Sequence, residues 1–225
     1  IEAAEILDLN TNFLYRSDDL PTDQYMAIEG SNGMIAAIAD AHSLEAAGDK
    51  ILAPLENGQL GTADNPFEGL IALDGNLTQE LLAQIATSPL FSKSDLRIAP
   101  ASPGKAERLL PLLGHKGATL YVNVEEAELL CQQSFSDAQM AAQSLVARGS
   151  NRVLVTHGPK LAALADVTGC VRATPPAVLA SRVTGAGDTF MAAHIAGELQ
   201  GLRGTAALQY ASNAAAAYVS GKSEG

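Results

Sequence analysis

The sequence lacks any apolar run approaching the roughly 20 residues that a membrane-spanning helix needs. It also lacks a basic start, since its first residues, IEAAEILDLN, are acidic, and we expect no secretory signal there. Cysteine is scarce: Cys131 and Cys170 are the only two, and their spacing forms no metal-binding pattern. We therefore expect free thiols in a reducing compartment, a cytoplasmic location and no membrane partner.

Clustered positive charge is absent as well. The 14 Lys and Arg residues are scattered singly among 25 Asp and Glu residues, which gives a net charge of −11. Because nucleic-acid binders usually carry a basic patch, we discount nucleic acid as a partner. If so acidic a protein binds an anion, it must use local devices such as helix N-termini, backbone N–H groups, a metal ion or a few placed cations.

Apolar runs typical of strands alternate with segments whose apolar residues recur at helical spacing. The expected strands span 69–75, 95–100, 118–123 and 152–158, each read as buried, followed by a hairpin of 161–166 and 170–175. The expected helices span 77–86, 104–113, 125–132, 137–148, 187–199 and 204–219. Ser136 and Gln139 suggest a capping box for the fourth helix, and Gly149 suggests its end. Residues 187–199 are apolar almost all round until Glu198, so we expect that helix to be buried. This order predicts an α/β fold with a mostly parallel sheet covered on both faces.

The first 40 residues have a different pattern. Residues 24–29 and 34–40, joined by the turn GSNG at 30–33, are typical of a β-hairpin. Such a hairpin can be a lid or dimer surface that projects from the parallel sheet, or an antiparallel edge of that sheet.

The octapeptide VTGAGDTF, residues 183–190, has the composition of an anion site. Gly185 and Gly187 let the backbone approach a ligand closely, and the N–H groups at the start of a helix point outward together. Asp188 then makes chemical sense as a base that accepts a proton from a hydroxyl attacking a phosphoryl group. The alternative is that Asp188 merely favours the helix dipole and the glycines serve packing.

Two further strand ends carry polar residues, and ligands of parallel sheets bind at that edge. Asn123 and Glu126 are spaced to hold a hydrated Mg²⁺ together, or to cap the helix that follows. Thr156 and Gly158 can contact phosphate oxygens, or form a plain turn.

The order N-x-x-E, T-x-G, G-A-G-D resembles the ribokinase-like, or PfkB, family of sugar and nucleoside kinases over nearly the whole chain. The resemblance implies a three-layer sandwich in one domain, 1–225, with residues 12–40 contributing a small β lid. It implies that the protein transfers a phosphoryl group from ATP to a primary hydroxyl group of a small-molecule sugar or nucleoside. Mg²⁺, a monovalent cation such as K⁺, and a homodimer through the lid are further candidates.

The same resemblance assigns roles to individual residues. Asp188 would be the catalytic base beside an anion hole, and Asn123 and Glu126 would organise Mg²⁺. The anion hole would comprise Gly185, Ala186 and Gly187, and the nucleotide site would include Thr156, Gly158, Thr184 and Asn213.

Within the family the chain is most similar to pseudouridine kinases, through PTDQYMAI (21–28), AIAD (37–40), LDGNL (73–77) and ASPGKA (101–106). Asn76 and Lys105 would then contact the substrate, with the 5′-hydroxyl of pseudouridine as the acceptor. The alternative substrates are ribose, fructose and another nucleoside. The alternative function is a non-catalytic role in binding a nucleotide or sugar. A dinucleotide-binding oxidoreductase is disfavoured, because Gly-Ala-Gly comes late in the chain.

The chain departs from the family pattern in three places. Arg182 and Val183 stand where many members carry Asp-Thr, and Arg182 can either reach a phosphate or be exposed. Leu161 replaces a common glycine of the nucleotide loop. The family's N-terminal strands and Gly-Gly substrate motif would precede Ile1, so we expect the natural protein to be longer.

Overall fold

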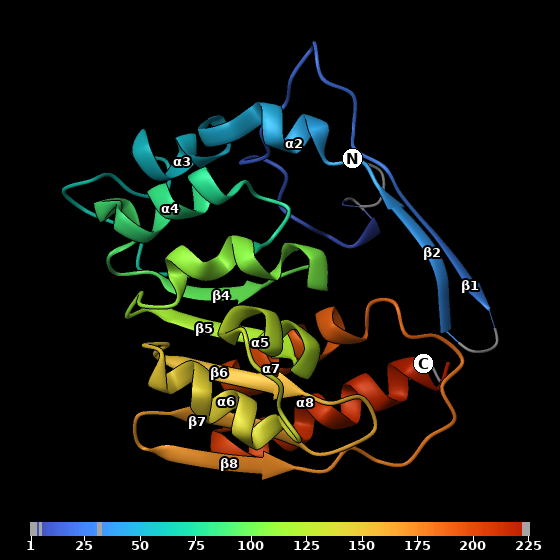
Figure 1. Cartoon of the computed structure of the whole chain (residues 1–225). Helices are drawn as coiled ribbons and strands as arrows, with labels where there is room; N and C mark the ends of the chain where they lie inside the picture. Colours follow the sequence, from blue (N-terminus) through green and yellow to red (C-terminus); the bar gives the residue numbers. More distant parts are fainter. Residues whose placement is uncertain (1–3, 5, 31–32, 222–225) are drawn as a thin grey trace.

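A six-stranded sheet forms the centre of the computed structural model, which describes residues 4, 6–30 and 33–221 (Figure 1). Its strand order is β3-β4-β5-β6-β7-β8; β3 to β6 are parallel, and β7 and β8 are antiparallel to their neighbours. The strands are β3 (Leu70–Asp74), β4 (Asp95–Ala99), β5 (Ala118–Asn123), β6 (Arg152–Thr156), β7 (Ala162–Asp166) and β8 (Gly169–Ala173). The predicted mostly parallel sheet and its terminal hairpin are confirmed.

Helices cover both faces of this sheet and create a three-layer sandwich. Successive residues of a strand point to opposite faces, so Leu120 and Val122 of β5 pack in one core and Tyr121 in the other. The first layer comprises α4 (Gln79–Thr87), η3 (Pro103–Leu112), α5 (Val124–Cys131) and α6 (Ala138–Ala147). The second comprises α7 (Ala186–Leu199) and α8 (Gly204–Val219), seen behind the sheet in Figure 1. The short elements are α2 (His42–Ala47), η1 (Gly48–Leu52), α3 (Ala53–Glu56) and η2 (Pro89–Phe91).

Strand β3 lies at the margin of the sheet and is less buried than its apolar sequence predicts. Ile71 and Leu73 pack against the first-layer core, but Ala72 on the opposite face is exposed. The buried side chains of α7 and α8 pack on the strands from β5 to β8, so this layer leaves Ala72 uncovered.

Two helix predictions were wrong in detail. Residues 103–112 form a 3₁₀ helix rather than an α-helix, and Pro111 within it cannot donate the backbone hydrogen bond that an α-helix requires. The N-cap of α6 is Asp137, whose Oδ1 accepts from Met140 N at 2.9 Å, whereas Ser136 Oγ donates to the Asp137 carboxylate and to Met140 Sδ and caps no backbone amide. Aspartate caps a helix as well as serine does and adds a favourable charge to the dipole.

Helix α7 is buried on one side only. Phe190, Met191 and His194 are buried, whereas Ala192 and Leu199 are exposed. The prediction of burial nearly all round was therefore wrong, because α7 belongs to an outer layer of the sandwich. The predicted bounds of α8 are confirmed.

Strands β1 (Tyr25–Gly30) and β2 (Gly33–Ala39) form a separate antiparallel hairpin, drawn as an arm beside the sandwich in Figure 1. The interpretation as an edge of the central sheet is therefore wrong. Two residues of the predicted turn, 31 and 32, lie outside the described part of the chain. Large apolar side chains of the hairpin are exposed, namely Tyr25, Met26, Ile28, Ile35 and Ile38.

Both cysteines are free thiols, as expected. Among the described residues, none of the helices combines the length and the apolar character that crossing a lipid bilayer would require.

Candidate active site

The polar residues that end the parallel strands share one edge of the sheet. Asn123 at the end of β5 is the direct register partner of Thr156 at the end of β6. Asp74 ends β3, two strand spacings or about 10 Å from β5. The carboxyl edge therefore brings the predicted metal residue Asn123 beside the predicted nucleotide residue Thr156, with the end of β3 to one side.

The segment 183–188, which we call the anion loop, leads into α7. Gly185 is the N-cap of α7 in the left-handed region, with φ of 85° and ψ of 0°. A Cβ atom on Gly185 would lie 2.6 Å from Tyr218 Oη, so glycine is required both by conformation and by space. A Cβ atom on Gly187 would meet nothing within 4 Å. Gly187 thus faces open space, whereas Gly185 faces protein.

The turn before α7 already uses one amide of the anion loop. Ala186 N donates to Val183 O at 3.1 Å, and Thr189 N makes the first helical bond, to Gly185 O, at 2.9 Å. Gly187 and Asp188 lie between these two donors, in the first turn of α7, where amides are directed at the helix N-terminus. Asp188 itself is exposed.

Glu126 lies near Asp188, although 62 positions separate them in the sequence. Burial raises the pKa of the Glu126 carboxyl, and the negative charges of Glu125 and Asp188 raise it further, against the hydrogen bond from Asn123 N. The start of α7 therefore lies within electrostatic range of the start of α5, which follows the carboxyl end of β5.

Asn123 and Glu126 form a complete capping box for α5. Asn123 Oδ1 accepts from Glu126 N at 2.9 Å, and Glu126 Oε2 accepts from Asn123 N at 2.8 Å. The capping alternative is thus realised, and Glu126 is only 7% exposed. A buried carboxylate repelled by a neighbouring one suits a cation, and Mg²⁺ takes few protein oxygens and keeps several waters. The donor set therefore fits a hydrated Mg²⁺; within the described residues no group of three or more His, Cys, Asp and Glu side chains could hold a metal alone.

Thr156 and Gly158 follow the same edge into an open turn. Gly158 has a φ of 54°, and a Cβ atom there would meet nothing within 4 Å. Lys160 N donates to His157 O at 3.0 Å and closes the turn.

Asn76 and Lys105, the two predicted substrate residues, are brought together next to the end of β3. Lys105 Nζ donates to Asn76 Oδ1. Asp74, which the sequence analysis did not assign to the site, accepts from Asn76 N at 2.9 Å and from Asn76 Nδ2 at 2.8 Å. Asp74 therefore fixes the orientation of the Asn76 amide; its place at the carboxyl end of an apolar strand was the available signal.

Arg108 is a second residue that sequence reasoning missed. Its Nη1 donates to Glu45 Oε1 of α2 at 3.1 Å and to the carbonyl oxygens of residues 75, 76 and 77 at 3.3 to 3.4 Å. Arg108 thus ties the loop that carries Asn76 to the helix that follows the hairpin.

Asn213 and Thr184 each make a contact that involves α8. Asn213 is exposed on α8 and accepts from Gln209 Nε2 at 2.9 Å, while Gln209 also donates to Thr174 O at 3.0 Å. Thr184 O accepts from the hydroxyl of Tyr218, near the end of α8, at 2.9 Å. Tyr218 was missed because its role depends on how α8 packs.

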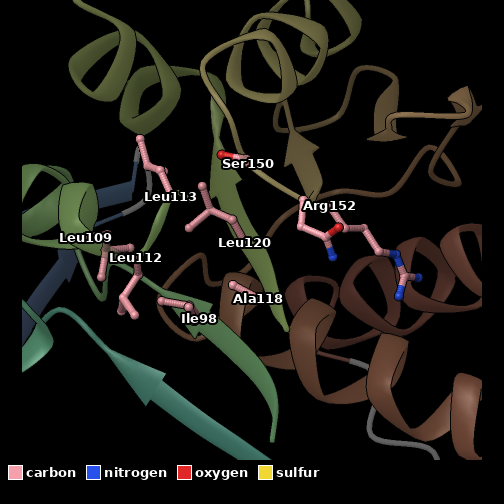
Figure 2. A pocket seen from close by; sticks show the side chains of 9 residues that line it. Ile98, Leu109, Leu112, Leu113, Ala118, Leu120, Ser150 and Arg152 are labelled. Atoms are coloured by element: carbon pink, nitrogen blue, oxygen red, sulfur yellow. The ribbon is translucent and has the colours of Figure 1, made fainter. Parts of the chain in front are cut away.

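The enclosed cavity drawn in Figure 2 lies away from this edge. It is lined by residues at the amino ends of β5 and β6, among them Ala118 and Arg152, and its volume of about 10 Å³ suits about one water molecule. A larger hollow of about 210 Å³ lies between residues 12–16 and 50–59. Neither of these two hollows is lined by the polar residues at the carboxyl edge of the sheet.

A family model described as pfkB family carbohydrate kinase matches residues 2–225. Among solved structures, a carbohydrate kinase from Agrobacterium tumefaciens is 25% identical, with a TM-score of 0.72 over 96% of this chain and 67% of that one. Ribokinase from Thermotoga maritima is 19% identical, with a TM-score of 0.75 over 97% of this chain and 69% of that one. Adenosine kinase from Trypanosoma brucei brucei is 14% identical, with a TM-score of 0.73 over 97% and 70%. No curated protein matches the chain in a sequence comparison.

Proposed function

Because this chain belongs to the pfkB family of carbohydrate kinases, we propose that it transfers the γ-phosphoryl group of ATP to a primary hydroxyl group of a sugar or nucleoside. The leading acceptor is the 5′-hydroxyl of pseudouridine, on the strength of the sequence features around Asn76 and Lys105. The observation that carries the proposal is the exposed Asp188 in the first turn of α7, beside open space at Gly187 and near the buried Glu126.

In the proposed reaction, the Asp188 carboxylate accepts the proton of the acceptor hydroxyl as its oxygen attacks the γ-phosphorus. The first-turn amides of Gly187 and Asp188 donate to the oxygens of the phosphoryl group in flight, and Gly185 and Ala186 shape the turn that aims them. Positive helix-dipole charge at the same point favours the anion.

The remaining predicted residues position the two substrates. Asn76 and Lys105 would hydrogen-bond the acceptor, and Thr156, Gly158, Thr184 and Asn213 would line the nucleotide site. Asn123 and Glu126 would hold Mg²⁺ through its waters; the ion neutralises charge on the ATP phosphates. Replacing K⁺ by tetramethylammonium in the assay tests whether the reaction requires a monovalent cation.

The test compares wild type, Asp188→Asn and the control Asp166→Asn, which changes a carboxylate that lies in the β7–β8 turn and bonds Thr168. Pseudouridine, uridine, adenosine, ribose and fructose serve as acceptors in a coupled ADP assay. We expect Asp188→Asn to bind ATP but to lose about 10²- to 10⁴-fold in kcat, the usual contribution of a positioned base. Turnover within a few-fold of wild type would remove Asp188 as the base; ATP binding without turnover on any acceptor by wild type would favour a non-catalytic binder.

The hairpin is the surface that we propose for a homodimer, because five large apolar side chains are exposed on its two strands. Met26 and Ile38 are register partners, so they form one continuous apolar spot. Sedimentation should show a dimer that Ile38→Glu dissociates; a monomeric wild type would contradict this contact.

A further inference from the structure

Arg182, just before the anion loop, is attached to the last turn of α8. Its guanidinium carbon lies 3.8 Å from the centroid of the Tyr218 ring, and its Nε donates to Tyr218 O at 3.0 Å. The backbone amides of Ser181 and Arg182 both donate to Val219 O, at 2.7 and 3.3 Å. The carbonyl end of a helix carries partial negative charge, so the guanidinium is favourably placed both there and over the ring.

Tyr218 in turn contacts the anion loop. Its hydroxyl donates to Thr184 O at 2.9 Å, and the same oxygen limits the space beside Gly185 to less than a methyl group needs. Arg182 covers one face of the Tyr218 ring, and the Tyr218 hydroxyl contacts the loop at the start of α7. The contacts form a continuous chain from Arg182 through Tyr218 to Thr184 and Gly185.

We propose that Arg182 is a positioning residue for phosphoryl transfer. Its guanidinium holds the Tyr218 ring, and Tyr218 fixes the Thr184–Gly185 turn that aims the Gly187 and Asp188 amides. The inference rests on the proposed kinase function. It assigns Arg182 to the loop, because the Nε donor and one planar face of the guanidinium contact α8.

Arginine is suited to this task in a way that lysine is not. A guanidinium stacks its flat face on an aromatic ring while its edge donates a hydrogen bond, whereas an ammonium group is a compact point charge. Arg182→Lys should therefore restore only part of what Arg182→Ala removes.

Arg203 provides a matched control. Its Nη1 donates to Glu198 O at 2.6 Å and Leu202 O at 2.7 Å, so it makes the same kind of contact at the C-terminal end of α7, remote from the anion loop. Arg203→Ala removes an exposed arginine from a helix end without touching Tyr218.

The kinetic experiment measures kcat and both KM values for the acceptor that wild type phosphorylates fastest. We expect Arg182→Ala to lower kcat about 10-fold or more, with each KM within about 3-fold, since misaimed amides affect the transition state most. We expect Arg182→Lys to be intermediate, Arg203→Ala to stay within about 2-fold, and about 50 mM guanidinium chloride to raise kcat of Arg182→Ala alone. Equal losses in the two alanine variants, or kcat of Arg182→Ala within about 2-fold of wild type, would overturn the proposal.

Amide hydrogen exchange gives a readout that needs no turnover. Residues 183–188 should exchange faster in Arg182→Ala than in wild type or Arg203→Ala. If wild type proves inactive on every acceptor while this difference is found, the kinase assignment fails and the positioning contact stands. Unchanged exchange in the loop would overturn the contact itself.

Discussion

The two glycines of the anion loop differ in backbone conformation and in their surroundings. Gly185 combines a positive φ with a Tyr218 hydroxyl where its Cβ would be, whereas Gly187 is helical and borders open space. The space at Gly187 is open to solvent and would be open to a bound phosphate. The local structure therefore requires glycine at position 185, whereas at position 187 only the proposed phosphate binding would favour it.

Alanine at each position tests this distinction. We expect Gly185→Ala to lower the free energy of unfolding by about 1–3 kcal/mol through backbone strain and the clash with Tyr218. We expect Gly187→Ala to leave stability unchanged or raise it by about 0.5–1 kcal/mol, because alanine is the better helix former, yet to lower kcat at least about 10-fold. Urea denaturation and the ADP assay measure the two effects; full activity in Gly187→Ala would mean that no phosphate occupies that space.

At the scale of elements, Arg108 joins three of them: η3, which carries it, α2 through Glu45, and the loop after β3. Removing it frees the backbone that presents Asn76. We expect Arg108→Ala to raise the KM of the acceptor about 10-fold and to leave the KM of ATP within about 2-fold, since Arg108 contacts none of the residues proposed for the nucleotide site. Glu45→Gln removes only the partly exposed ion pair and should change the acceptor KM by no more than about 2- to 3-fold. Equal increases in both KM values would show that Arg108 acts on the whole fold instead.

The elements were predictable where local chemistry decides them. The strands follow from short apolar runs, and the capping box of α5 was one of the two interpretations that the Asn123–Glu126 spacing allowed. Other predictions failed. The N-cap of α6 is Asp137 and not the adjacent Ser136, and one side of α7 is exposed because this helix lies in an outer layer of the sandwich. The hydrogen bond between Tyr218 and Thr184 depends on the packing of α8 against α7, and the sequence around either residue does not predict that packing.

Across the whole molecule, a buried polar cluster joins α7 to the sheet. Arg97 of β4 donates to Glu198 Oε2 at 2.6 Å and to the Tyr121 hydroxyl at 2.9 Å, Arg152 of β6 donates to Glu198, and Tyr121 also meets His194 Nδ1 at 2.9 Å. Burial lowers the pKa of His194 to about 4. Glu198 has a pKa of about 2, because hydrogen bonds from Arg152 and Arg97 outweigh the opposing effect of burial.

These pKa values make the fold sensitive to acid. Histidine in the unfolded chain takes up a proton near its ordinary pKa of 6.5, but folded His194 resists protonation down to about 4. The free energy of unfolding should therefore decline as pH falls from 6.5 to about 4, by on the order of 3 kcal/mol from this residue. Glu198 adds a further loss below about pH 4.5, the ordinary pKa of a glutamate, since its pKa is depressed in the folded state. Urea titrations of His194→Gln should show a flatter pH dependence between about 6.5 and 4.5; curves parallel to wild type would contradict this account.

The marginal place of β3 has a consequence for the protein at high concentration. No strand of the described chain pairs with its outer edge, and its sequence, LIALD, is apolar until the last residue. Unpaired backbone groups along such an edge can template the addition of a strand from another molecule. The opposite edge, β8, carries Arg172 and begins with a glycine, features that discourage such pairing. We therefore expect a chain of these 225 residues to self-associate at high concentration through the edge of β3 rather than that of β8, and light scattering would detect the association.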